Sequence, residues 1–174
     1  MVNYISKYAS PLGGILIAAD DEGLTGLWFE GAKYFALGLG DVREERESEA
    51  IKEAKRWLDI YFSGSEPSST PPLHPTGTPF QLEVWDILRS IPYGTTVSYG
   101  YVANVLAQRR GVLRTSAQAV GGAVGHNKIS LIIPCHRVVG ADGSLTGYAG
   151  GLDKKIELLK SEGVDMSEFS RGGY

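Results

Sequence analysis

The run Ile132-Ile133-Pro134-Cys135-His136-Arg137-Val138-Val139 contains the only cysteine of the 174-residue chain. Apolar residues flank this cysteine on both sides, and a histidine follows it directly. Because proline fixes its own φ and biases the preceding residue towards extended backbone, we expect a strand-like segment that delivers Cys135 to a defined turn. The thiolate is the reactive form of cysteine, and a neighbouring base or positive charge raises its fraction. Taken alone, however, Cys135 is better explained as a small buried apolar residue, because most cysteines are unreactive.

The composition is that of a soluble globular protein with one or two domains. One cysteine excludes an internal disulfide, and the three histidines (His74, His126 and His136) are scattered without zinc-site spacing. We therefore expect no metal site built by the protein and no bound cofactor. The first residues lack the apolar run of a signal peptide, and no stretch is long enough to span a membrane. The expected location is the cytoplasm.

The net charge of −3 is unevenly distributed along the chain. Residues 1–77 carry 7 Lys and Arg against 12 Asp and Glu, whereas residues 78–164 carry 9 against 6. The half that contains Cys135 is therefore basic. A basic balance of this size is compatible with a domain that faces phosphates, but it does not by itself indicate one.

Residues 1–77 are predicted to form an α/β domain that ends in a linker. Three short strands are expected, at residues 4–8, 15–19 and 24–29. A helix is predicted over residues 43–62 because apolar residues recur on one face, namely Ile51, Ala54, Leu58 and Tyr61. The pattern of residues 31–41 is ambiguous. A stretch rich in Ser, Pro and Thr at 63–79 is expected to be a loop with His74 simply solvated in it.

Residues 78–165 are predicted to form a second, mostly helical domain, followed by a flexible tail at 166–174. Helices are expected over residues 79–90, 98–106, 117–125 and 152–162. A basic loop at 108–114 joins the second and third of them, which gives a helix-turn-helix outline.

The third of these helices is almost bare of large side chains. Its sequence includes Ala117, Ala119, Gly121, Gly122 and Ala123. Two glycines inside a helix cost about 2 kcal/mol in propensity relative to alanine. Two explanations stand side by side: close packing against another element, or close approach of the helix backbone to something bulky such as a nucleic-acid groove.

The segments around Cys135 together resemble the O6-alkylguanine-DNA alkyltransferases. The run Pro134-Cys-His-Arg-Val138 is similar to the active-site signature of that family. It is accompanied by Gly94-Thr-Thr-Val-Ser-Tyr99, Ala119-Val-Gly-Gly-Ala123, Asn127, Gly147-Tyr-Ala-Gly-Gly-Leu152 and Glu162-Gly163. The likeness extends from about Thr78 to Gly163, and the N-terminal part resembles the family more loosely. The resemblance implies a ribonuclease-H-like α/β domain, with a small sheet plus a helix, followed by a mostly α, winged-helix-like domain with a helix-turn-helix.

The resemblance also implies a reaction. Cys135 would take the alkyl group, typically methyl, from O6 of guanine, and also from O4 of thymine, and keep it as a thioether, so that each molecule acts once. His136 would draw the thiol proton through a water, and Glu162 would orient and charge-balance His136. Asn127 would help to order the turn under the site. The implied partner is double-stranded DNA containing O6-alkylguanine, bound by a monomer away from any membrane, with the damaged nucleotide flipped out of the stack.

The same resemblance assigns residues to the DNA interface. Tyr99 would crowd the phosphate of the flipped nucleotide, Tyr148 would flank the alkyl pocket, and backbone amides near Tyr148 and Ala149 would bond to O6. The remaining expected contacts are Arg114, Gln118, Ala119, Gly122 and Val138. In the family the helix-turn-helix enters the minor groove, which is only about 6 Å wide, so the bare helix would be needed there.

Two departures from the family pattern are visible. Gln118 stands where many relatives have an arginine finger that fills the gap left by the flipped base. Some relatives also bind zinc through N-terminal cysteines and histidines, and residues 1–77 contain no cysteine. We therefore expect slower flipping without loss of chemistry, and no zinc site.

Three other interpretations remain. A non-catalytic protein of the same fold that binds alkyl lesions would lack the nucleophile. A cysteine hydrolase using Cys135 and His136 would need an oxyanion hole, which the sequence does not reveal. A transcription regulator built on the helix-turn-helix would leave Cys135 with a structural role. Arg137 is expected to be a structural ion-pair partner rather than a catalyst.

Overall fold

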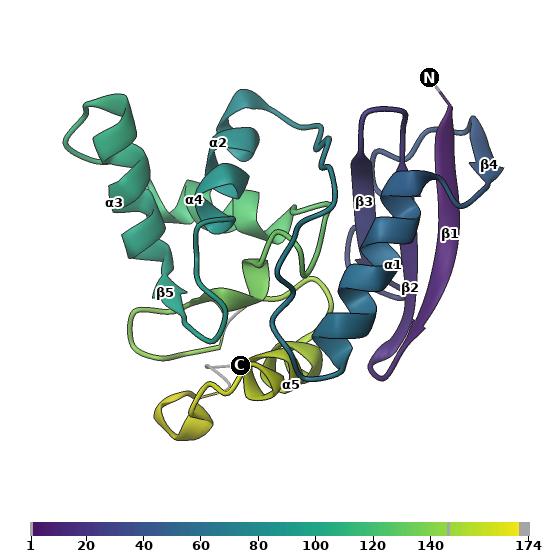
Figure 1. Cartoon of the computed structure of the whole chain (residues 1–174). Coiled ribbons are helices and arrows are strands. Elements are labelled where there is room, and N and C mark those ends of the chain that lie inside the picture. The colour runs from purple at the N-terminus through teal and green to yellow at the C-terminus, as the bar shows by residue number, and fades with distance from the viewer. Residues whose placement is uncertain (1, 146, 171–174) are drawn as a thin grey trace. The chain divides into compact units, whose positions relative to one another are not determined.

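The computed structural model of the protein describes residues 2–145 and 147–170, which form two compact units (Figure 1). The first unit consists of Met1–Thr76 with the returning segment Lys128–Ile132, and the second of Gly77–Asn127 with Ile133–Tyr174. The returning segment joins the first unit through backbone hydrogen bonds. The N–H of Leu27 donates to the carbonyl of Lys128 (2.8 Å), and the N–H of Ser130 donates to the carbonyl of Leu27 (3.0 Å).

A four-stranded sheet in the order β3-β2-β1-β4 forms the centre of the first unit (Figure 1). Its strands are β1 (Asn3–Ser10), β2 (Gly13–Ala19), β3 (Leu24–Phe29) and β4 (Arg43–Glu45). The first three are antiparallel neighbours, and β4 runs parallel to β1. The three strands expected from the sequence are thereby confirmed.

The helix predicted from residue 43 begins later than expected. Arg43–Glu45 pairs with β1 as strand β4, and α1 covers Glu49–Phe62. Ser48 is the N-cap of α1, because its hydroxyl accepts a hydrogen bond from the N–H of Ile51 (3.4 Å). A side-chain cap of this kind replaces one of the hydrogen bonds that the first helical turn lacks.

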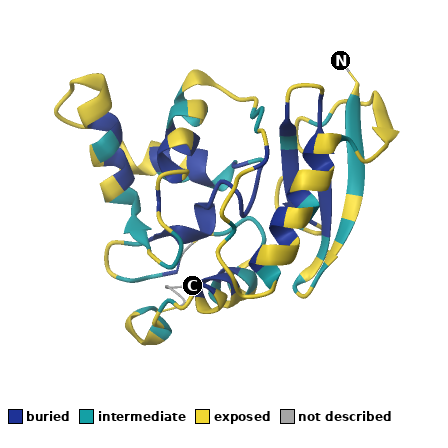
Figure 2. Ribbon diagram, in the orientation of Figure 1, coloured by how far each residue is buried: buried dark blue, intermediate teal, exposed yellow. Residues whose placement is uncertain are grey.

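Both faces of the sheet are covered. The predicted core face of α1 is confirmed, since Ile51, Ala54, Leu58 and Tyr61 are all buried (Figure 2). On the sheet, Leu16, Ala18 and Trp28 form a separate apolar cluster, against which Ala36 and Leu39 pack. The ambiguous segment 31–41 is therefore a series of turns that contributes apolar side chains to this cluster.

The second unit is mostly helical, as predicted. Its helices are α2 (Pro79–Leu88), α3 (Tyr99–Arg110), α4 (Ala117–Gly125) and α5 (Leu152–Ser161), with 3-10 turns η1 (Cys135–Arg137) and η2 (Met166–Glu168). Two short parallel strands, β5 (Val97–Ser98) and β6 (Val138–Val139), connect the start of α3 to the segment after Cys135. The indole N–H of Trp85 donates to the carbonyl of Ala123 (2.8 Å), which fixes α4 against α2.

The helix-turn-helix consists of α3 and α4. Gly111 ends α3 in the left-handed region (φ 65°), as is common at helix C-termini. The hydroxyl of Thr115 donates to the carbonyl of Ala103 (2.6 Å), and Ser116 caps α4.

Helix α3 is one turn longer than predicted, so the first half of the expected basic loop is helical. Arg109 forms an ion pair with Asp86 of α2 (2.8 Å), and Arg110 forms one with Glu83 (3.0 Å). These contacts extend α3 beyond its last apolar residues.

Residues 166–170 pack onto the second unit. Met166 and Phe169 contact an apolar cluster formed by Val139, Leu145 and Leu159. Residues 166–170, expected as the start of a flexible tail, therefore contribute to the core, and residues 171–174 of that tail lie outside the described residues. None of the described helices is both long and apolar enough to cross a lipid bilayer.

Candidate active site

Cys135 begins the 3-10 turn η1 and is almost completely buried, with 6% of its surface exposed. The strand-like segment expected before it does not form. Residues 130–133 are turns and bends, with Leu131 in the left-handed region (φ 71°). The N–H of Cys135 donates to the carbonyl of Ile133 (2.8 Å), so a tight turn sets the position of the sulfur.

Asn127 lies under this turn. Its Nδ2 donates to the carbonyl of Ile133 (2.8 Å), and the side chain is buried. The resemblance implied that Asn127 orders the turn, and the position of its amide fits that expectation.

The environment of Cys135 favours the neutral thiol. Burial raises the pKa of the Cys135 thiol, because a charge is poorly solvated inside the protein. A hydrogen bond from Asn127 and the positive charge of Lys155 lower this pKa, but burial dominates. Ionisation of the sulfur therefore needs a base.

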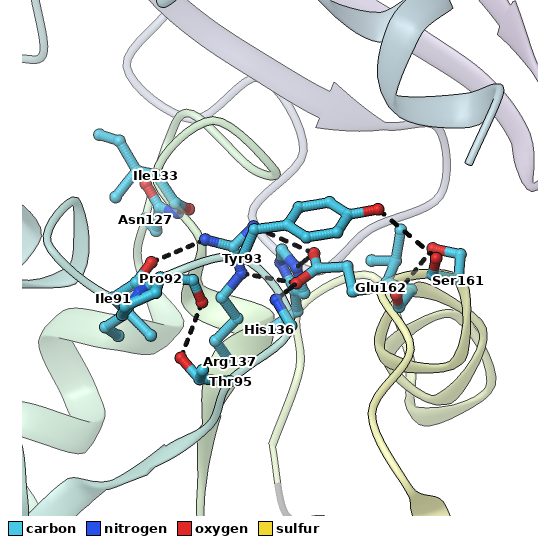
Figure 3. A network of polar contacts seen from close by, with 12 residues as sticks. Ile91, Pro92, Tyr93, Thr95, Asn127, Ile133, His136, Arg137, Ser161 and Glu162 are labelled. Carbon is cyan, nitrogen blue, oxygen red and sulfur yellow. Dashed lines mark hydrogen bonds and ion pairs between the residues drawn. The ribbon is translucent and has the colours of Figure 1, made fainter. Parts of the chain in front are cut away.

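His136 follows Cys135 and is fully buried. Its Nε2 lies 2.6 Å from Oε2 of Glu162, 26 residues away in the sequence (Figure 3). Burial lowers the pKa of His136, and the hydrogen bond to Glu162 opposes this shift. The ring is therefore mainly neutral at neutral pH, which is the form that can accept a proton.

Glu162 is held by more than the imidazole. Arg137 donates from Nε to Oε1 (2.8 Å) and from Nη2 to Oε2 (3.1 Å) of Glu162, and the N–H of Gly94 donates to Oε1 (3.0 Å). Arg137 also donates from Nη1 to the carbonyl of Ile91 (2.8 Å). Arg137 is thus the structural ion-pair partner that was expected, and Figure 3 shows the network it completes.

Lys155 is a site residue that the sequence analysis missed. Its side chain is fully buried, and Nζ donates to the carbonyls of Val138 (2.7 Å) and Gly147 (3.4 Å). Burial lowers the pKa of Lys155 to about 8, and Cys135 opposes this shift. The sequence did carry a signal: Lys155 falls on the apolar stripe of α5 formed by Leu152, Ile156 and Leu159.

Tyr99 and the glycine-rich loop lie close together. Tyr99 is the first residue of α3, and burial followed by the effect of Cys135 raises its pKa to about 12. A Cβ atom built on Gly147 would lie 3.8 Å from the hydroxyl of Tyr99, and one built on Gly121 would lie 3.8 Å from its ring. Tyr148 and Ala149 are half-buried in the loop. The phenol therefore lies near both α4 and the loop.

The remaining predicted DNA contacts lie on the surface of the helix-turn-helix. Arg114, Gln118, Ala119 and Gly122 are exposed, whereas Val138 is buried beside the cysteine turn. A Cβ atom on Gly122 would meet no described atom within 4 Å. Packing inside the protein therefore does not require glycine at position 122.

His74 is not simply solvated, so that expectation was wrong. Its Nδ1 lies 2.5 Å from Asp20 and its Nε2 lies 2.9 Å from Glu22, and the three side chains are of metal-binding types. The two ring nitrogens contact different carboxylates, which is the arrangement of an ion pair. It links the β2–β3 turn to the segment before α2.

Comparison with known proteins gives consistent matches over both units. Residues 79–164 match the model described as "6-O-methylguanine DNA methyltransferase, DNA binding domain", and residues 3–75 match its "ribonuclease-like domain". Proteins named methylated-DNA--protein-cysteine methyltransferase are 44% identical in Methanosarcina acetivorans (92% of this chain, 98% of the relative) and 40% identical in Haemophilus influenzae (92% and 87%). The solved structure of Mycobacterium tuberculosis OGT in complex with DNA has a TM-score of 0.77 at 35% identity, covering 98% of this chain and 96% of that one.

Proposed function

This chain belongs to the 6-O-methylguanine DNA methyltransferase family and acts on DNA in direct-reversal repair, and on that premise we propose that Cys135 is the acceptor of the alkyl group. The observation that carries the proposal is the arrangement of three residues. The single cysteine is followed by a buried histidine whose Nε2 is bonded to the buried carboxylate of Glu162. Nucleophile, base and orienting group in this order are typical of an activated cysteine.

The proposed substrate is O6-alkylguanine in double-stranded DNA, with O4-alkylthymine as a second lesion. Cys135 is only 6% exposed, so its sulfur cannot reach a base that is stacked in a duplex. The damaged nucleotide must therefore leave the helix, at a cost of a few kcal/mol. The exposed, small-residue surface of α4 supports the approach of a DNA groove to this part of the second unit.

The reaction is a displacement at carbon. His136 is bonded to Glu162 through Nε2, so the thiol proton is received at Nδ1, through a bridging water. The thiolate attacks the alkyl carbon, the carbon–O6 bond breaks with its electron pair on oxygen, and guanine is restored once it takes up a proton. Glu162 fixes the imidazole and balances the charge that it gains.

The product is a thioether, and each protein molecule acts once. A carbon–sulfur bond at a saturated carbon is not cleaved by the groups present at this site, so turnover stops. The proposed active form is a monomer that accepts one alkyl group. A non-catalytic lesion-binding protein is disfavoured, because Cys135 is present and the curated relatives are named as methyltransferases.

Intact-protein mass spectrometry tests the proposal. After mixing with a duplex that carries O6-methylguanine, we expect one added methyl group per chain, located on Cys135 by peptide mapping. The Cys135→Ser variant should bind the same duplex and gain no mass. Repeated turnover without a covalent product would favour a cysteine hydrolase, and DNA binding without any methyl transfer would favour a lesion-binding or regulatory protein.

A further inference from the structure

The turn between α3 and α4 carries the most exposed large apolar side chain among the described residues. Leu113 is 99% exposed, whereas the other exposed large apolar side chains have between 37% and 62% of their surface exposed. Its neighbour Val112 is 49% exposed, and Figure 2 shows the turn as exposed at the end of α3. Burial of a leucine side chain is favourable, so leucine is usually withdrawn from water. Two adjacent apolar side chains exposed in this way point to a partner outside the chain.

Hydrogen bonds hold the turn on both sides of Leu113. The N–H of Val112 donates to the carbonyl of Ala107 (3.0 Å), and the hydroxyl of Thr115 donates to the carbonyl of Ala103 (2.6 Å). Both acceptors belong to α3. The backbone therefore presents Leu113 in a defined position, and little of the chain has to be ordered when this side chain enters a partner.

The charges around the turn favour nucleic acid as this partner. Residues 87–141 contain no Asp or Glu, and the residue that follows the exposed leucine is Arg114. Arg109 and Arg110 form ion pairs with α2, whereas Arg114 forms none with a described residue. A free guanidinium beside an apolar tip suits the phosphate backbone of DNA. The turn also belongs to the part of the chain, residues 79–164, that matches a DNA binding domain.

A leucine has no hydrogen-bonding group, so it can act on DNA in only two ways. It can contact the methyl group of thymine, or it can enter between adjacent base pairs as a wedge that unstacks them. Unstacking has a use here, because the proposed reaction requires one nucleotide to leave the duplex. Gln118 on α4 is five residues further along the chain. Five residues span at most about 17 Å, so the wedge would lie within about five base-pair steps of the bases that Gln118 faces.

We propose that Leu113 is a positioning residue for nucleotide flipping, whose side chain enters between base pairs near the damaged nucleotide and weakens the stacking that holds it. The inference deepens the proposed function and rests on DNA as the substrate. Arg114 binds the adjacent phosphate and limits how deeply the leucine enters. The wedge touches the DNA but not the reacting atoms, so the chemistry at Cys135 does not depend on it.

Fluorescence of 2-aminopurine tests the wedge directly, because this base becomes brighter when it is unstacked. A series of duplexes carries O6-methylguanine at one fixed position and 2-aminopurine at each position within about five steps on either side. The protein carries Cys135→Ser, so that the complex forms without methyl transfer. We expect one rise beside the lesion, caused by flipping, and a second rise elsewhere in the series.

The second rise should disappear in a protein that also carries Leu113→Ala, because alanine is too short to separate two base pairs. Leu113→Met, which keeps a long apolar side chain, should preserve it. A series without a second rise would overturn the proposal, and so would a second rise that survives Leu113→Ala.

The rates of methyl transfer from duplex and single-stranded DNA provide an independent measurement. Leu113→Ala should act on the duplex about tenfold more slowly. It should act on the single strand at the wild-type rate, because no base pairs have to be separated there. Leu37→Ala is the matched control: Leu37 is a 47% exposed leucine of the first unit, and both rates should stay unchanged. An equal loss with both forms of DNA, or a duplex rate within twofold of the wild type, would overturn the proposal.

Alkylation by iodoacetamide controls for the integrity of the site. Sulfur displaces iodide and a thioether forms, and the signal reports Cys135 alone because the chain has no other cysteine. Leu113→Ala should react at the wild-type rate, since the exposed side chain takes no part in the core. If neither form of DNA methylates Cys135 while the fluorescence series behaves as expected, the proposed function is at fault and not the role of Leu113.

Discussion

The Nε2 atom of His136 lies 2.6 Å from Oε2 of Glu162, and neither side chain exposes any surface. The same carboxylate also accepts hydrogen bonds from Arg137 and from the N–H of Gly94. Glu162 therefore orients the proposed base and at the same time anchors the segments that carry it. Its catalytic and structural contributions have to be measured together.

Replacement of Glu162 by glutamine should reduce both stability and activity. The amide keeps the shape but loses the charge, which leaves the buried guanidinium of Arg137 uncompensated. We expect a loss of about 3 kcal/mol in the free energy of unfolding and at least about tenfold slower methyl transfer. Urea denaturation and the rate of labelled-methyl transfer provide the two readouts.

Glu157→Gln is the matched control. Glu157 is exposed on α5, the helix that Glu162 follows, with its carboxylate 3.8 Å from Lys160. Exposed ion pairs contribute less than about 1 kcal/mol, so both readouts should be nearly unchanged. Equal effects of the two substitutions would contradict the role assigned to the buried carboxylate.

The stability of the protein should decrease in mild acid because of His136. Burial lowers the pKa of His136 below its value in the unfolded chain, so the unfolded state takes up a proton first as the pH falls. The contribution of the buried neutral imidazole to the free energy of unfolding is complete above about pH 6.5, the ordinary pKa of histidine. It is lost as the pH falls below this value. Urea denaturation between pH 5 and pH 8 should show this decline. A His136→Gln variant should show a smaller decline over the same range, and an unchanged slope would argue against a neutral buried imidazole.

The apolar patterns of the sequence were sufficient for most of the fold. Ile51, Ala54, Leu58 and Tyr61 correctly indicated the buried face of α1. Strand β4 was missed because Arg43–Glu45 has no apolar residue and all three residues are exposed, so no buried side chain marks the pairing with β1. A strand of this kind leaves no periodicity in the sequence to detect.

The candidate site, too, could be predicted only in part from the sequence. The run around Cys135 indicated the proposed nucleophile and its neighbour, but the contact between His136 and Glu162 joins residues that are 26 positions apart in the sequence. A local sequence pattern cannot show that two residues so far apart in the sequence are in contact. Lys155 was overlooked because charged residues are usually placed at the surface, although its neighbours at helical spacing are apolar.

Gly122 offers a way to separate DNA binding from folding. Glycine is unfavourable within a helix, and outside the backbone of α4 no described atom lies within 4 Å of a Cβ atom at this position. Gly122→Ala should therefore raise the free energy of unfolding by about 1 kcal/mol. Gly122→Leu should bind duplex DNA more weakly, because a larger side chain would fill the surface that we propose faces the groove.

Thermal denaturation and fluorescence anisotropy with labelled duplex measure these two effects. Alkylation of Cys135 by iodoacetamide is the control, since this reagent does not require DNA to be bound. We expect this reaction to be unchanged in both variants. Wild-type duplex affinity of a folded Gly122→Leu protein would show that α4 does not approach a groove.

The side chain at position 118 should affect the rate at which duplex DNA is repaired. Gln118 is exposed in the first turn of α4, at the position where the resemblance implies an arginine finger. An arginine would reach further and form a charge-assisted hydrogen bond to the unpaired base, which is worth about 1.5 kcal/mol. Gln118→Arg should thus repair duplex DNA about tenfold faster, without a change in the rate at which iodoacetamide alkylates Cys135. Gln108→Arg adds the same charge at an exposed glutamine of α3 and controls for a general increase in DNA affinity. Equal acceleration by both substitutions, or none by Gln118→Arg, would mean that position 118 does not fill the gap left by the flipped base.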